Sequence, residues 1–191
     1  MRNSLILGIT MQLQPEHVQR LNEIDVEDFS GVRRKVAEHF EELGRPVTDD
    51  FLDRGVHALK QYYAMIVLDP ANIHAMSRQV DPFWHAHILH SKQYMDFCSR
   101  LIGEYIHHYP LNVHNEVQMG AIRPISDDTF TKIPMVFKNV DPEFWPKAFA
   151  GCEVICTDPC SQGYARNLHN IALFKPDPAM ESLGATYRSA N

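Results

Sequence analysis

The 191-residue chain has no glycine-rich phosphate loop, no nucleophile elbow and no Walker-type motif, so nothing in it predicts a nucleotide site or an acyl-transfer serine. It also lacks any run of lysine or arginine, and its formal net charge is −6, which argues against nucleic acid or an anionic membrane surface as a partner. The N-terminal stretch MRNSLILGITMQLQP has too short an apolar piece for a secretory signal, and no segment approaches bilayer length. We therefore expect a cytoplasmic protein that binds neither nucleic acid nor membrane.

Cysteine is scarce, since four residues are far too few for a disulfide scaffold. Cys98 stands apart, whereas Cys152, Cys156 and Cys160 follow one another at steps of four and are followed by His169. Three thiolates and an imidazole can form a closed structural zinc site. The spacing differs from the usual two-residue gap of zinc knuckles, so structural zinc, a redox or disulfide role, and unligated thiols all stay open.

The length and the composition, with 45% hydrophobic residues, predict one domain over residues 1–191. The spacing of apolar residues predicts that the first part of this domain, about 15–110, is helical. Asp25 is placed to cap a helix at its start and Gly44 to end it. The apolar positions of that helix recur at three- and four-residue steps: Phe29, Val32, Val36, Phe40 and Leu43. A second helix begins with Thr48 as N-cap and stops at Asp69-Pro70.

The remaining part of the domain covers about residues 111–191. Seven of the chain's twelve prolines lie after His114, and the apolar segments there are short. This pattern predicts extended segments, turns and a short helix or two, packed on the helical part because this half has too little periodic core to fold alone. The predicted fold is thus mainly α, a small helical bundle with a loop-rich, proline-containing half laid on it.

Five of the eleven histidines lie between Val80 and Pro110. Asp81 followed by Pro82 is a helix start signal, because aspartate caps free amides and the fixed φ of proline suits the first helical position. We expect one helix from Asp81 to about Gly103.

Two of these histidines share a face of that helix. His87 and His90 are three residues apart on the apolar side, whereas His85 points to the polar side. A turn after the helix can return His107 or His108 beside it. Three imidazoles with open positions would bind a divalent transition metal, Fe, Cu or Zn, which the donors alone do not distinguish.

Tyr94, one turn beyond His90, and Asp81, the nearest carboxylate, are the candidate catalytic residues beside this metal. The competing interpretation is that the histidines are hydrogen-bonded core residues and that Tyr94 and Cys98 are buried only for packing. His57, which has no histidine partner at ligand spacing, is interpreted as a surface residue.

Several residues of the segment follow a pattern: Asp81, Trp84-His85-Ala86-His87, Tyr94, Cys98, Gly103 and IHHYP. This pattern resembles the glycine-rich-domain-containing-protein-like family, with its D-x-x-W-H-x-H followed by a tyrosine and a later histidine. The resemblance covers about residues 80–110 and implies a helical module more than an activity. The positions it implies are Asp81, Trp84, His85, His87, Tyr94 and His108, so it adds His85 and leaves His90 to the helical-wheel argument alone.

Two functional classes follow. The first is a small metalloenzyme that activates oxygen with iron or copper, or water with zinc, on a small-molecule or peptide substrate. The second is a non-catalytic interaction or scaffold module organised by the Trp-His-x-His helix. For the first class, residues from about Asn112 to Phe149 are expected to wall the pocket over the histidines. The predicted apolar contacts are Tyr109, Met119, Phe130 and Phe144.

Overall fold

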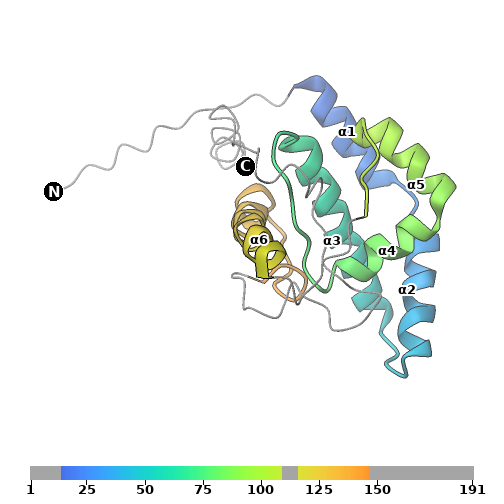
Figure 1. Cartoon of the computed structure of the whole chain (residues 1–191). Helices are drawn as coiled ribbons and strands as arrows, with labels where there is room; N and C mark the ends of the chain where they lie inside the picture. Colours follow the sequence, from blue (N-terminus) through green and yellow to red (C-terminus); the bar gives the residue numbers. More distant parts are fainter. Residues whose placement is uncertain (1–13, 109–115, 147–191) are drawn as a thin grey trace.

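The structure, a computed structural model, describes residues 14–108 and 116–146. Its helices in chain order are α1 (Pro15–Val26), α2 (Ser30–Glu42), α3 (Asp49–Leu68), α4 (Asp81–Leu89), α5 (Ser91–Phe97), the π-helical turn η1 (Cys98–Ile102) and α6 (Glu116–Val136). No strand occurs in the described ranges, so the mainly-α prediction is confirmed. Helix α3 lies in the middle, with α6 along one side and the other helices on the opposite side (Figure 1).

The helix ends around α3 follow the sequence signals. Thr48 caps α3, its Oγ1 accepting the N–H of Phe51 at 3.2 Å. Gly44 follows α2 with φ of +68°, the left-handed backbone that glycine adopts without strain. Asp69 ends α3 before the proline. These boundaries are local, which is why the sequence predicts them.

The start of α2 was predicted wrongly. Asp25 does not cap this helix, because the chain forms α1 through Val26 and then breaks before Ser30. The side chain that serves the new helix is Asp28, whose Oδ1 accepts the N–H of Ser30 at 2.8 Å. Asp25 instead occupies the last turn of α1.

Helix α4 crosses α3 at very close range. Phe83 is fully buried, and a Cβ on Gly55 would lie 2.0 Å from its Cζ. Only glycine leaves room for the ring at this crossing. Phe83 belongs to a continuous core that also holds side chains of α6 and of the segment after it, among them Phe130, Ile133, Val136, Phe144 and Trp145.

Helix α6 lies where the sequence predicts extended segments, turns and a short helix or two, so this part of the prediction is wrong. It runs for 21 residues and contains Pro124 and Pro134, each of which removes one backbone donor. Ile122, Phe130 and Ile133 are nonetheless buried at helical spacing, and this tertiary packing offsets the missing hydrogen bonds. Because this half contains many prolines, the helical spacing of these apolar residues was not recognised from the sequence.

A buried polar cluster joins the end of α3 to α6. Asp69 accepts hydrogen bonds from Lys132 at 2.8 Å and from Asn72 at 2.6 Å. His74 is fully buried, with its Nε2 2.9 Å from the carbonyl oxygen of Asp69. Since the acceptor is a carbonyl, Nε2 carries the hydrogen. Burial lowers the pKa of His74, so it is neutral in the folded protein.

The crossing of α3 and α4 yields a first prediction. Gly55→Ala should lower the free energy of unfolding by about 1–3 kcal/mol, because the methyl group displaces the enclosed ring of Phe83. Gly120→Ala is the matched control, since its methyl group on α6 meets nothing within 4 Å and should be neutral or stabilising by up to about 1 kcal/mol. Urea denaturation measures both; equal effects would show that the crossing is not tight.

The burial of His74 yields a pH prediction. The unfolded chain binds a proton at this imidazole below a pH of about 6.5, whereas the folded protein binds it only at a lower pH, so stability present above that pH is lost as the pH falls. In His74→Leu, the decrease in the free energy of unfolding between pH 7 and 5 should be shallower than in wild type, by at most about 1.4 kcal/mol per pH unit. Parallel urea titrations test this, and identical slopes would contradict a neutral buried imidazole.

Candidate site at the paired histidines

The single helix predicted from Asp81 to Gly103 is interrupted at His90. That residue has φ of −83° and ψ of 55°, and its Nδ1 lies 2.7 Å from the carbonyl oxygen of Ala86, closing α4. Its ring packs against α2, where a Cβ on Gly31 would lie 3.0 Å from Nε2. His90 is therefore the C-cap of α4 and not a residue of one continuous helix, although Tyr94, Phe97 and Cys98 beyond the break are buried, as the apolar spacing predicts.

His87 is a core histidine. It is fully buried, and its Nδ1 lies 2.8 Å from the hydroxyl of Tyr63. The rings of Phe29, Phe97 and Tyr94 meet it edge-on at centroid distances of 5.0–5.1 Å. Burial lowers the pKa of His87 to about 3, so the imidazole stays neutral. This environment corresponds to the competing interpretation of the sequence.

His85 and His108 form the pair that the structure does bring together. Their Nε2 atoms are 2.8 Å apart, with His85 contributed by α4 and His108 by the segment after η1. Asp81 lies behind His85, its Oδ2 3.2 Å from Nδ1. The Asp81 carboxyl is 1% exposed, and it does not cap α4 as predicted, because Val80 is the N-cap residue. One turn of helix therefore places a buried carboxyl against a partly buried imidazole.

Burial also sets the charges of this group. It raises the pKa of Asp81 to about 6, an effect that the neighbouring His85 opposes. Burial, together with His85, lowers the pKa of His108 to about 4. At neutral pH His108 is therefore neutral, as a ligand imidazole must be.

Trp84 and Tyr94 hold His108 in place. The Trp84 ring stacks on the His108 ring at a centroid distance of 5.7 Å and an interplanar angle of 27°. The Tyr94 hydroxyl accepts from Nε1 of Trp84 at 3.1 Å and donates to the carbonyl oxygen of Ile106 at 2.7 Å. Tyr94 is fully buried, and burial raises its pKa, which keeps the donating hydrogen in place. Tyr94 thus positions the chain two residues before His108.

The predicted trio of His87, His90 and His107 or His108 is not assembled. Within residues 14–108 and 116–146, no three side chains of histidine, cysteine, aspartate or glutamate are placed to hold one metal ion. The ring of His107 packs against Tyr105 at 4.9 Å. The described chain therefore brings two imidazole nitrogens together here, and the i, i+4 spacing of Asp81 and His85 is a sequence signal for the first of them only.

Other predicted residues lie elsewhere. Cys98 is buried in the core, while Cys152, Cys156, Cys160, His169 and Tyr109 lie outside the described residues. Three predicted pocket contacts pack on other apolar groups: Met119 joins the small cluster of Ile73, Ala75 and Ile122, Phe130 meets Trp145, and Phe144 meets Phe51 and Phe83.

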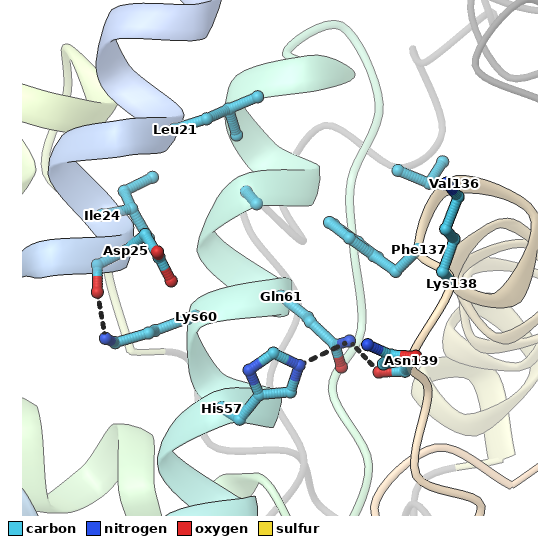
Figure 2. A pocket seen from close by; sticks show the side chains of 11 residues that line it. Leu21, Ile24, Asp25, His57, Lys60, Gln61, Val136, Phe137, Lys138 and Asn139 are labelled. Carbon is cyan, nitrogen blue, oxygen red and sulfur yellow. Dashed lines mark hydrogen bonds between the residues drawn. The ribbon is translucent and has the colours of Figure 1, made fainter. Parts of the chain in front are cut away.

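A pocket of about 340 Å³ lies apart from the paired histidines, between α1, α3 and the end of α6 (Figure 2). It shares no lining residue with the histidine site. His57, interpreted from the sequence as a surface residue, lines it together with Lys60 and Gln61. No sequence motif predicts this pocket, because its lining residues come from three separate segments of the chain.

The fold and site define a small helical protein with a histidine pair backed by a carboxyl. The family model for UCP032817-like proteins matches residues 19–122, more than half of the chain, and the chain belongs to this family. The resemblance to the glycine-rich-domain-containing-protein-like family is thereby corrected, although Asp81, His85, Tyr94 and His108 all fall inside the matched range. No curated protein and no solved structure matches the chain. In the described ranges, none of the helices has the length and apolar character needed to cross a bilayer.

The tyrosine link between α5 and the returning segment can be tested. Tyr94→Phe leaves the Trp84 indole N–H and the Ile106 carbonyl without their buried partner, and should lower the free energy of unfolding by about 1–3 kcal/mol. Tyr105→Phe is the control, since this side chain is 42% exposed and its change should fall within about 0.5 kcal/mol. Chemical denaturation measures both free energies of unfolding. If Tyr94→Phe leaves the free energy of unfolding unchanged, Tyr94 does not position the returning segment.

Proposed function

We propose that the protein binds a divalent transition-metal ion between His85 and His108. The observation that carries the proposal is the approach of their Nε2 atoms to 2.8 Å. Two imidazole nitrogens bound to one ion at about 2.0–2.1 Å lie about 3.3 Å apart at a tetrahedral angle and about 2.9 Å apart at a right angle. A shared ion therefore requires both rings to turn from the present contact until their Nε2 lone pairs point at it.

The carboxyl behind the pair supports this assignment. Metal-binding histidines commonly donate the hydrogen of their second ring nitrogen to a carboxylate, which fixes the tautomer and raises the basicity of the ligand. Asp81 faces that nitrogen of His85, with Oδ2 3.2 Å from Nδ1, in a contact that lacks hydrogen-bond geometry. With the hydrogen on Nδ1, the lone pair of Nε2 points towards His108.

Two protein ligands leave several coordination positions for water or a substrate. A zinc ion there would supply an activated water for hydrolysis, and iron or copper would supply oxidative chemistry. A small metalloenzyme acting on a small-molecule or peptide substrate is the function we propose on this basis. Tyr94, buried behind Trp84, is a positioning residue in this scheme.

The alternative is a non-catalytic module in which one imidazole simply donates a hydrogen bond to the other. The 2.8 Å distance suits such a bond, and the stack of Trp84 on His108 would then complete a structural clamp. The two functions differ in whether a metal ion is bound and in which variants lose it.

Metal binding is tested by titrating the chelator-treated full chain with Zn²⁺ and Co²⁺ by calorimetry and by elemental analysis after dialysis. Wild type should bind one ion per chain at this site. His85→Ala and His108→Ala should each weaken its affinity by at least about 100-fold, and Asp81→Asn by about 10–100-fold through the orientation of His85.

His107→Ala is the matched control, because it removes the neighbouring imidazole on the same segment and should leave this affinity unchanged. Circular dichroism checks that each variant stays folded. If wild type binds no ion, or if His107→Ala weakens binding as much as His108→Ala, the metal site is refuted and the clamp is favoured.

A further inference from the structure

The pocket of Figure 2 has an apolar end and a polar end, which is the composition of a small-ligand site. Leu21 and Ile24 of α1 line one side, and Val136 and Phe137 line the other. Its volume of about 340 Å³ falls in the range of pockets that enclose small ligands. These side chains form two facing apolar walls, between which the hydrocarbon part of a ligand can lie.

The polar end is organised by Gln61. This side chain is 4% exposed; its Oε1 accepts from Nε1 of Trp145 at 2.9 Å, and its Nε2 donates to the carbonyl oxygen of Asn139 at 2.8 Å. Both bonds fix which end of the amide is nitrogen. The same Nε2 lies 3.3 Å from Nε2 of His57 and has a second hydrogen to donate.

The fixed amide sets the tautomer of His57. Because Gln61 supplies the hydrogen between the two nitrogens, Nε2 of His57 is the acceptor and Nδ1 carries the hydrogen of the neutral ring. Figure 2 shows Nδ1 on the side of the ring that faces Lys60. Lys60 follows His57 by three residues on α3, so both donors share one face of the helix.

Lys60 is a cation without a charged partner in the described ranges. Its Nζ donates to the backbone carbonyl of Asp25 and lies 5.8 Å from the centre of the Phe29 ring, and it makes no ion pair with the part of the chain that the structure describes. Two of its three hydrogens are left for other acceptors. The Asp25 carboxylate also lines the pocket and repels anions, which favours a ligand with a single negative charge held against Lys60 over one with two.

We propose that this pocket binds a small organic monoanion with an apolar body, of the class of medium-chain carboxylates. Lys60 and the Nδ1–H of His57 hold the carboxylate, and the hydrocarbon lies between Ile24 and Phe137. The site is independent of the paired histidines, so it does not rest on the proposed metal binding.

The probe is octanoate, titrated into the full chain by calorimetry and followed by the shifts of amide resonances. Octanoate should bind with a dissociation constant below about 1 mM, and octan-1-ol and octylamine, which lack the anion, at least about tenfold more weakly. Lys60→Met keeps the apolar stem and should lose at least about tenfold in octanoate affinity. Lys60→Arg should retain most of it, and His57→Leu should lose severalfold.

Lys92→Met, an exposed charge removal on α5, is the matched control and should bind octanoate as wild type does. His85→Ala should also bind it normally, which separates this result from that of the metal titration. Circular dichroism verifies folding. Absence of octanoate binding to wild type, equal affinity for octan-1-ol, or a folded Lys60→Met variant with unchanged affinity would overturn the proposal.

Discussion

The Tyr94 hydroxyl is the contact on which the geometry of the histidine site depends. It joins the indole of Trp84 on α4 to the carbonyl of Ile106 on the returning segment, and it does so where no water competes. Each of these buried hydrogen bonds contributes about 0.5–1.5 kcal/mol, but leaving the partners unsatisfied would cost more. Because the chain reaches His108 two residues later, this link decides whether the two imidazoles meet.

The histidines of this protein illustrate how burial and partner decide the role of one residue type. His87 is enclosed by aromatic rings and stays neutral in the core. His74 holds the segment after α3 against the end of that helix through the backbone carbonyl of Asp69. His85 is partly accessible, backed by a carboxyl and faced by a second imidazole, a combination that is common among metal ligands.

Helix α3 serves both candidate sites from different faces. One face carries Tyr63, which fixes His87 and thereby the packing of α4, and another carries His57, Lys60 and Gln61 at the pocket. The close crossing at Gly55 holds α4 against this same helix. The central position of α3 thus makes the two sites parts of one packed core, although they share no lining residue.

The sequence by itself determined what is local: the helical class, the cap at Thr48, the left-handed glycine at 44 and the concentration of histidines after residue 80. It misjudged Asp25, the proline-containing helix α6 and the helix through His90, because packing against distant segments outweighs propensity and periodicity at each place. The pairing of His85 with His108 was decided only by the tertiary structure. Their contact spans 23 residues and requires a helix break, a π-turn and the Tyr94 link, none of which a spacing rule contains.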